Sequence, residues 1–425
     1  MSSSVSADRG DEVRIGIGLS SMGFVLAGLG ACVAILARDL DEPTSRLALL
    51  SSGFAAGLLI VAVVGPRLLR SWPIPTVLAI GSLVCAVGTV LLALAPAYGV
   101  AIAGGLCIGL GGALLVLVAP LLLDGPTAAA KLSRVNAVAS GTGILAPLTI
   151  GALDSLGPTG RLAMLAAAPP LLLLAVLTWR ATPPVRSRPR GPVPVLIDSA
   201  PAVGLARRWS GRRSKKLGRA VVVSVGLGWL RVVLAVSVEF CFVVWAVARL
   251  VSTGLPTATA AVLGTAFPVG MAIGRAIGPI NWRGWSPVIP SGALAAAGTL
   301  LVSGFDAPAW VAIGLAIAGL GVAPLYPVTL AALVATPGLS SARLSAIGAL
   351  ASGTAILVAP ALLAVLARVL DLRTAYLVTL PLIAVLFALS HSRANRHVQR
   401  DDLHVRREPD SEAGIADRPR TPHTD

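Results

Sequence analysis

Twelve stretches of about 20 mostly apolar residues follow one another along this chain, and they constrain its fold more than any other feature. A helix needs about 20 such residues to cross a lipid bilayer. Only 12% of the residues are charged, whereas soluble domains carry about 25%. We therefore expect an all-α integral membrane protein with twelve transmembrane helices. The expected spans are 15–37, 47–66, 74–95, 98–123, 135–156, 160–179, 229–250, 258–280, 286–304, 308–334, 343–367 and 373–391.

A polar, basic and proline-rich segment divides these spans into six and six. We expect a disordered N-terminus (1–13), a six-helix bundle (14–180), a basic linker (181–219), a second six-helix bundle (220–393) and a disordered tail (394–425). The first apolar run is too long for the core of a cleavable signal peptide, so it is interpreted as the first span.

The basic residues decide the orientation of these spans. With the N-terminus in the cytoplasm, 28 of the 34 Lys and Arg residues fall on the inner side and six on the outer side. The positive-inside rule therefore predicts that both termini are cytoplasmic. The Arg-rich, Ala- and Leu-rich composition suggests a bacterial source, and hence a multi-pass protein of the plasma (inner) membrane. The basic run 207–219 is interpreted as an anchor at anionic lipid rather than a nucleic-acid site, since no nucleic-acid-binding fold accompanies it.

The two halves of the chain repeat one another. Around the second span the pattern is Phe54-x2-Gly57-x7-Gly65-Pro66-x3-Arg70-x-Trp72, and the same six positions recur 213 residues later, from Phe267 to Trp285. In the fifth span Ala139-Ser-Gly-Thr-x-Ile-Leu145 recurs as Ala351-Ser-Gly-Thr-x-Ile-Leu357, and Arg161 recurs as Arg373, both at an offset of 212. Because each repeat holds six spans, the two halves enter the membrane in the same orientation, as in one large class of transporters.

On these motifs, the sequence over about residues 14–391 resembles the major facilitator superfamily. The loop after span two and its copy after span eight lie where that family has a Gly- and Arg-rich gating motif, although the family's usual Asp is missing from both copies. The fifth span partly matches the family's Gly–Pro motif, which is associated with antiporters, and the tenth span resembles its proline-containing tenth helix. The residues that match these motifs are Gly65, Pro66, Arg70, Gly278, Pro279, Arg283, Gly143, Pro147, Gly151, Pro324 and Pro327.

These glycines and prolines have two interpretations. Small residues allow helices to approach closely in lipid, and a proline bends a helix, so the residues could serve static packing. The resemblance implies instead that some of them act as pivots or gates during alternating access.

Glu239 is the one charged residue well inside a predicted span. It lies about 12 Å along the helix from Arg231, near the middle of the bilayer, where a carboxylate must be protonated, paired or hydrated. It could bind a proton or a cationic substrate group, it could pair with a polar neighbour, or the span could be shifted toward water. Phe242 shares its helix face, and the resemblance implies that Tyr326 on the tenth span lines the same cavity. We therefore take Glu239, Tyr326, Phe242 and Arg231 as the candidate substrate and proton site.

The remaining chemistry excludes most other functions. The four cysteines lie far apart inside apolar runs, the four histidines all follow residue 390, and the spans hold no phosphate-binding loop. We expect no metal, no cofactor and no enzymatic activity. The favoured function is proton-coupled secondary transport of a small molecule, with export preferred, by a chain that works as a monomer in contact with membrane lipid. The alternatives are uptake of a neutral metabolite, with protons or by facilitated diffusion, and a non-transporting sensor on the same fold.

Overall fold

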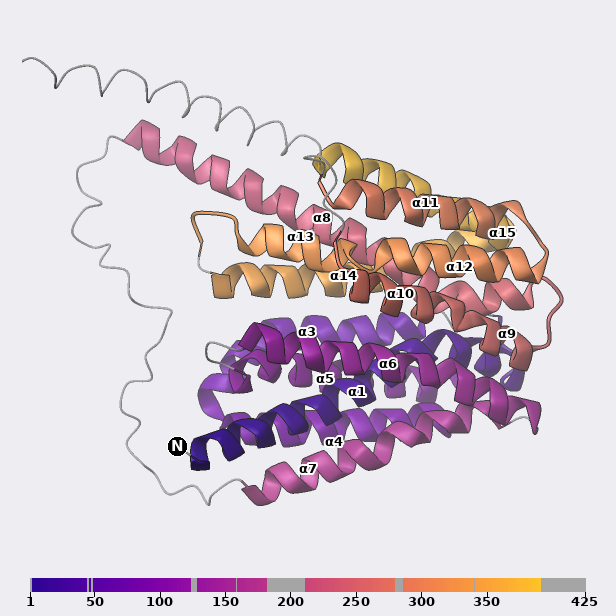
Figure 1. Ribbon diagram of the computed structural model, residues 1–425, viewed down its shortest axis with the longest axis horizontal. Coiled ribbons are helices and arrows are strands. Elements are labelled where there is room, and N and C mark those ends of the chain that lie inside the picture. The colour runs from indigo at the N-terminus through magenta and orange to yellow at the C-terminus, as the bar shows by residue number, and fades with distance from the viewer. Residues whose placement is uncertain are drawn as a thin grey trace, which may run out of the picture.

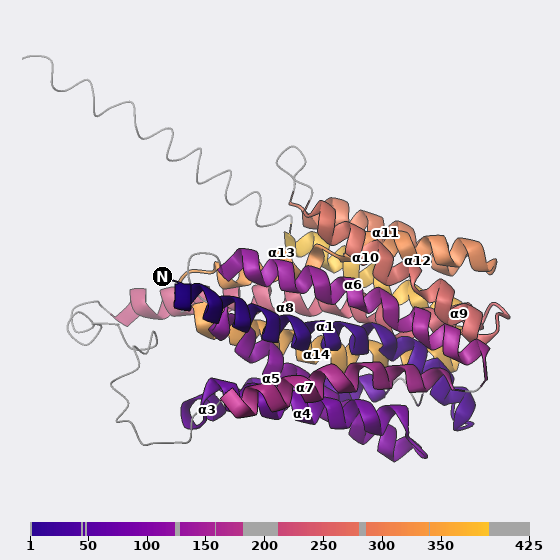
Figure 2. The ribbon, with the colours of Figure 1, turned by 60° about the horizontal axis from the view of Figure 1, so that its bottom comes forward.

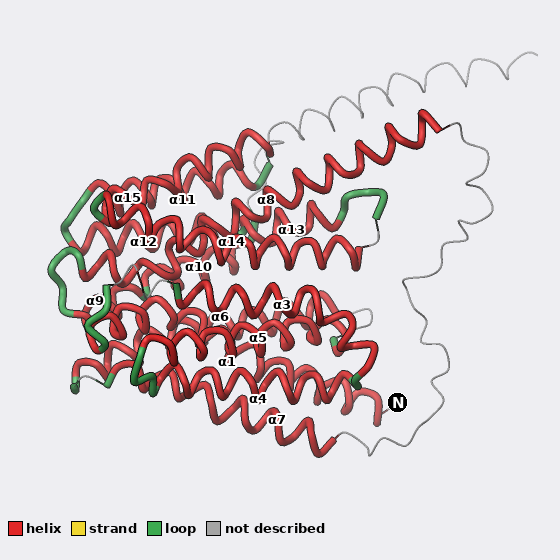
Figure 3. The backbone as a smooth tube through the Cα atoms, turned by 180° about the vertical axis from the view of Figure 1, so that it is seen from behind, coloured by secondary structure: helices red, strands yellow, loops and turns green. Residues whose placement is uncertain are grey.

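The computed structural model describes residues 2–43, 46, 49–123, 128–157, 159–181, 211–279, 286–339 and 341–390. Within these ranges the regular structure is entirely helical, with short connecting loops (Figure 3). Ten helical segments are long and apolar enough to cross a membrane, and two shorter apolar ones, Leu50–Gly65 and Val288–Gly304, account for the other two expected spans. The fold expected from the sequence is therefore confirmed.

The helices of the two sequence halves form two groups that lie side by side (Figures 1 and 2). The first group contains α1 (Ser2–Asp39), α3 (Leu50–Ser71), α4 (Ile74–Ala93), α5 (Tyr98–Leu122), α6 (Ala128–Ser155), the 3-10 helix η1 (Gly160–Ala167) and α7 (Ala168–Ala181). The second contains α8 (Gly211–Val251), α9 (Thr257–Gly264), α10 (Ala266–Ile277), α11 (Val288–Gly304), α12 (Pro308–Val322), α13 (Leu325–Val334), α14 (Ser341–Val369), α15 (Leu372–Ala375), η2 (Tyr376–Val378) and a last helical stretch at 379–390.

We call these groups the N-half and the C-half. The linker end of the molecule is where α1 begins and α7 ends at Ala181 (left in Figure 1), and the far end is opposite.

The repeated glycines make the same contacts in both halves. A Cβ atom on Gly109 of α5 would lie 2.0 Å from the carbonyl oxygen of Phe54, and one on Gly319 of α12 would lie 2.2 Å from that of Phe267. Gly57 meets the backbone of α5 and Gly270 that of α12 with similar closeness. Because lipid provides no hydrophobic drive between helices, close backbone packing of this kind holds membrane bundles together. The sequence repeat is thus a repeat of helix–helix interfaces.

Several spans are interrupted where the sequence offers a reason. The eighth span breaks at Thr265, between α9 and α10, three residues before Pro268. The tenth span breaks at Ala323 and Pro324, between α12 and α13. A proline lacks the N–H that would continue the helical ladder. Pro147 and Pro360, in contrast, lie inside the continuous helices α6 and α14.

Two segments expected to be irregular are helical in the structure. The expected disordered N-terminus (1–13) forms the first turns of α1 from Ser2 onward. An ion pair of 3.0 Å between Arg14 and Asp11 lies along this helix, and Arg134 of α6 reaches Glu12 at 2.7 Å. Pairs of this kind stabilise a polar helix end. Of the expected linker, residues 211–219 belong to α8, while 182–210 and the tail from 391 lie outside the described residues.

Candidate functional site

Glu239 lies in the middle of α8, and its side chain is only 15% exposed. Its neighbours along α8, Val238 and Phe240, are buried apolar residues. The nearest charged atom is a terminal guanidinium nitrogen of Arg275, 3.7 Å from the carboxylate oxygen Oε1. The carboxylate is therefore paired with a cation from α10 rather than left alone among apolar side chains.

Arg275 lies in the last turn of α10, where the helix dipole favours a cation. Its guanidinium also donates a hydrogen bond of 2.7 Å to the hydroxyl of Ser140 on α6. Ser140 in turn donates to the carbonyl oxygen of Asn136, 2.9 Å away. Because α6 belongs to the N-half and α10 to the C-half, Arg275 connects the two halves and carries Glu239 into that connection.

Tyr326 approaches the same carboxylate from the break in the tenth span. It is the second residue of α13, directly after Pro324, and it is partly buried. Its hydroxyl interacts with the side chain of Ser352 on α14 and lies close enough to Glu239 for the two groups to influence one another electrostatically. The structure thus brings together Glu239 and Tyr326, two of the residues selected from the sequence.

Ser140 and Ser352 occupy equivalent positions in the repeated Ala-Ser-Gly-Thr motif of α6 and α14. One accepts a hydrogen bond from Arg275 and the other interacts with Tyr326. The duplication therefore supplies a serine hydroxyl from each half to the same region. We define the central site as Glu239, Arg275, Tyr326, Ser140 and Ser352.

Phe242 and Arg231 lie elsewhere. Phe242 is fully buried and stacks on Phe267 at 5.4 Å between ring centroids, with Tyr376 at the same distance on another side. Arg231 is buried toward the linker end of α8, and its guanidinium donates to the carbonyl oxygen of Leu389 in the last helical stretch. Both side chains pack within the C-half, and we leave them out of the proposals below.

The Gly–Pro residues of α6 have neighbours in both halves. Gly143 packs against Gly23 and Ala27 of α1, in its own half. Gly151 packs against α9 of the C-half, where a Cβ would lie 2.7 Å from the Ala258 carbonyl oxygen. Pro147 is buried between these two contacts. One face of α6 therefore follows α1 while its far end meets the other half.

The two copies of the loop motif differ. Gly65 lies inside α3 and packs against Leu117, whereas Gly278 ends α10 with a φ of 77°, a conformation that favours glycine. Pro279 follows in an exposed position. The side chains of Pro66 and Arg70, and the whole of Arg283, lie outside the described residues. In the tenth span, Pro324 is buried at the break and Pro327 is exposed on α13.

The two halves approach most closely toward the far end. A Cβ on Gly30 of α1 would lie 2.2 Å from the carbonyl oxygen of Val243 on α8, and the Gly151–Ala258 contact lies on the same side. Toward the linker end, the side chains of Arg275 and Ile277 on α10 are exposed, as are Asn136 and Val138 on α6. This pattern is that of a transporter closed at the far end and open at the linker end.

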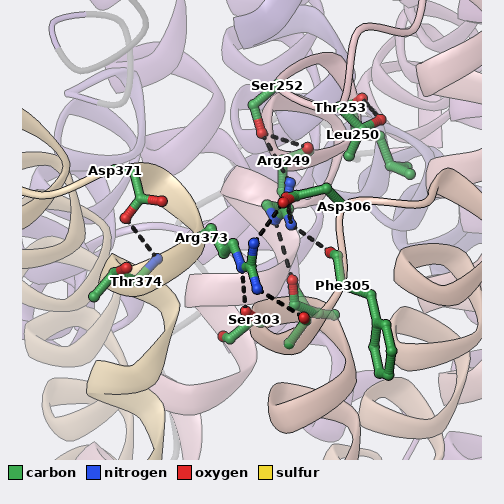
Figure 4. A network of polar contacts seen from close by, with 12 residues as sticks. Arg249, Leu250, Ser252, Thr253, Ser303, Phe305, Asp306, Asp371, Arg373 and Thr374 are labelled. Carbon is green, nitrogen blue, oxygen red and sulfur yellow. Dashed lines mark hydrogen bonds and ion pairs between the residues drawn. The ribbon is translucent and has the colours of Figure 1, made fainter.

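A second polar cluster lies at the far end of the C-half (Figure 4). Arg249 of α8, only 1% exposed, and Arg373 of α15 both bind the carboxylate of Asp306. The remaining guanidinium nitrogens donate to carbonyl groups at the end of α11, which have no partner within that helix. These carbonyls belong to Val302, Ser303, Gly304 and Phe305. We call Arg249, Asp306 and Arg373 the C-half clasp.

The N-half contains a counterpart built from equivalent arginines. Arg161 donates to the carbonyl oxygen of Ala95, just beyond α4, at 2.7 Å, and lies 3.5 Å from Asp39. Arg38 binds Asp39 at 2.9 Å and holds Asp154 of α6 through two hydrogen bonds of 2.8 Å. Arg38, Asp39 and Arg161 form the N-half clasp.

Sequence reasoning missed the role of Arg275 and both clasps. Arg275 had been counted only as a basic residue near the inner end of a span, and its orientation toward Glu239 depends on the rotation of α10. For the clasps a signal existed, because Arg38 and Arg249 are separated by 211 residues, nearly the 212 that separate Arg161 and Arg373. Among the described residues, no group of three or more His, Cys, Asp or Glu side chains could hold a metal ion.

Comparisons with known proteins define the class of fold. No family model and no curated protein matches the chain. Among solved structures, it resembles an inward-facing, unoccupied bacterial homolog of the human lysosomal transporter Spinster, with a TM-score of 0.63, 14% identity and coverage of 92% of this chain and 98% of that one.

It also resembles the nucleoside transporter NupG, with a TM-score of 0.64, 12% identity and coverage of 90% of this chain and 98% of that one. The *E. coli* fucose:proton symporter FucP gives 0.54, 17%, 89% and 98% for the same quantities. The chain therefore has the fold of major facilitator superfamily transporters, as a multi-pass membrane protein.

Proposed function

We propose that this chain is a secondary active transporter that moves a small molecule by alternating access and couples this movement to protons through Glu239. The observation that carries the proposal is the position of a nearly buried carboxylate, Glu239, beside the seam between the two halves, facing a cation that is hydrogen-bonded across that seam. A charged group inside a membrane is a functional site by default, with its partner named.

Proton coupling follows from the exchange that this geometry allows. While Glu239 is ionised it holds Arg275 by electrostatic attraction, and when it takes a proton that attraction ends. Among the described residues, Arg275 and Tyr326 are the charged or titratable groups that face Glu239. Because Arg275 also binds Ser140 of the N-half, the protonation of Glu239 alters a contact between the halves. A protonation event is thereby linked to the movement that alternating access requires.

The direction of transport depends on what the proton competes with. Export by antiport was preferred on the Gly–Pro motif of α6, and a cationic substrate would compete with the proton for Glu239. In the structure Glu239 already faces a cation, so a substrate cation would have to displace Arg275 against charge repulsion. The Glu239–Arg275 contact thus favours the alternative, uptake of the substrate together with a proton, and we propose symport as the mode of coupling.

The remaining assignments complete this proposal. The bundle boundaries of 14–180 and 220–393 define the two moving bodies, and the linker end faces the cytoplasm of a bacterial plasma membrane, with both termini on that side. The chain works as a monomer, since both halves that form the central site belong to one chain. Lipid surrounds the bundle, and no nucleic-acid partner is proposed.

The test is a flux measurement on the purified full chain in proteoliposomes loaded with the pH indicator pyranine. A panel of neutral, anionic and cationic metabolites and drugs is added outside in turn. A transported compound that enters with protons acidifies the lumen, and the protonophore-collapsed control accumulates no compound. A chain that moves no compound of the panel under any gradient is a non-transporting protein, and the proposal then fails.

A further inference from the structure

Arg275 presents a partly exposed guanidinium at the central site, which is unusual for a cation so close to the middle of a membrane bundle. Its side chain is 43% exposed, whereas that of Glu239 is 15% exposed. The separation of 3.7 Å from Glu239 is longer than a hydrogen bond, so the contact is a charge interaction without a shared proton. One guanidinium nitrogen is hydrogen-bonded to Ser140. A guanidinium has five N–H donors, so donors remain for another group.

A planar array of N–H donors with a positive charge matches one class of ligand group. Arginine binds carboxylates through two parallel hydrogen bonds, a geometry that a lysine or a hydroxyl does not reproduce. The hydroxyl groups of Ser140 and Tyr326 add neutral hydrogen-bonding partners beside it. From this geometry we infer that Arg275 binds the carboxylate or other singly charged anionic group of an organic substrate. This inference rests on the proposed transport function and specifies its substrate class.

The charge of the site limits the substrate to one negative charge. In the empty site the charges of Arg275 and Glu239 cancel. When a monoanion takes the place of Glu239 at the guanidinium, one proton must bind the Glu239 carboxylate to restore neutrality, since an unpaired charge is costly in a bundle surrounded by lipid. On release, the anion leaves Arg275 and the proton leaves Glu239, which again pairs with the guanidinium. One anion and one proton therefore move together, and no net charge crosses the membrane.

This cycle predicts that proton binding and anion binding strengthen one another. Lowering the pH converts Glu239 to its neutral form and frees Arg275 for the substrate. Glu239→Gln mimics the protonated carboxyl group, so this variant binds the anion at every pH. Arg275→Gln removes the anion-binding group. The two variants therefore have opposite effects on binding, which a merely structural ion pair would not produce.

The experiment measures ligand binding to the purified full chain in detergent, by isothermal titration, for three matched sets of probes. The sets are acetate, lactate and benzoate, their neutral amides, and the cations ethylamine and benzylamine. We expect at least one acid to bind ten times more tightly than its amide and than either amine. Its affinity should rise as the pH falls from 8 to 6, and should be independent of pH in Glu239→Gln.

Arg275→Gln should weaken binding of that acid at least tenfold, and Arg275→Lys should recover only part of it. The matched control is Arg368→Gln, which removes an exposed arginine from the far end of α14 and should leave binding unchanged. Circular dichroism and size exclusion confirm that each variant is folded. The inference is overturned if no acid of the panel binds, if an amide or an amine binds as tightly as the acid, or if folded Arg275→Gln binds normally.

The flux assay separates this inference from the proposed function. Flux of a neutral or cationic compound with protons would overturn the monoanion assignment and leave proton-coupled transport standing. Selective acid binding without flux would have the reverse meaning.

Discussion

Arg275 of the C-half donates a hydrogen bond of 2.7 Å to Ser140 of the N-half while its guanidinium faces Glu239 at 3.7 Å. One arginine is thus shared between a neutral acceptor across the seam and a carboxylate in its own half. Any event that changes the charge of Glu239 changes what holds α10 to α6. This relationship is the physical basis of the proposed coupling.

Ser140→Ala tests whether the contact across the seam stabilises the conformation seen here. The substitution removes the acceptor of Arg275, and a hydrogen bond to a charged group contributes about 1.5–3 kcal/mol, less where the donor is exposed. We expect the population open at the far end to increase severalfold. The measurement is the distance between spin labels at Ser155 and Ala307, exposed residues at the far end of the two halves. An unchanged distance distribution would show that the contact has no influence on the equilibrium.

Gly30→Leu should trap the opposite conformation. A Cβ at this position would lie 2.2 Å from the backbone carbonyl of Val243, which cannot move aside as a flexible side chain could. We expect the far end to stay open, so that the distance between the labels at 155 and 307 increases and transport falls at least tenfold. Gly16→Leu on the same helix is the control, because a Cβ on Gly16 meets nothing within 4 Å. Equal behaviour of the two variants would contradict the proposed closure.

Gly109→Ala and Gly319→Ala test the repeated interfaces. In each case the new methyl group would meet a backbone carbonyl oxygen, of Phe54 at 2.0 Å or of Phe267 at 2.2 Å. Overpacking of this kind costs about 1–3 kcal/mol, so both variants should melt at lower temperature than wild type, by similar amounts. Gly226→Ala should not lower the melting temperature, because its site is open. If only one of the pair is destabilised, the two interfaces are not equivalent.

The clasps predict a difference between buried and exposed arginines. Arg249→Gln removes a guanidinium that is 1% exposed and leaves carbonyls at the end of α11 without their donor. Breaking a buried charge pair costs about 3–5 kcal/mol. We expect a larger loss of thermal stability than for Arg373→Gln, whose side chain is 38% exposed, and little loss for Arg368→Gln. Fluorescence-monitored melting of the purified variants gives the order, and a stable Arg249→Gln would show that the clasp is not structural.

Much of the fold could be predicted because each span carries its own signal. A run of about 20 apolar residues is sufficient to identify a transmembrane helix, and the conserved spacing of Phe54, Gly57 and Gly109 against Phe267, Gly270 and Gly319 reflects backbone contacts that tolerate no larger residue. The position of Glu239 near the middle of α8 followed from counting residues. These inferences need only distances along one helix.

The partners of Glu239 could not be predicted, because they depend on how different helices rotate and bend. A helical wheel places Phe242 near the face of Glu239, yet α8 has neighbours on several sides, and Phe242 packs into the C-half against Phe267 and Tyr376. Arg275 reaches the site from a short helix that begins after the break at Thr265. No pattern within α10 indicates that its last turn faces α8 and α6 rather than lipid or water.

The measurement that tests the central claim most directly compares two kinds of flux for Glu239→Gln in proteoliposomes, with a transported compound from the panel. Exchange of labelled for unlabelled substrate needs no net proton movement, whereas accumulation under an inward proton gradient does. The account predicts that Glu239→Gln retains exchange but loses accumulation and its dependence on pH, while Glu42→Gln, which removes a carboxylate at the far end, retains both. Gradient-driven accumulation by Glu239→Gln at the wild-type level would contradict the assignment of Glu239 as the proton carrier.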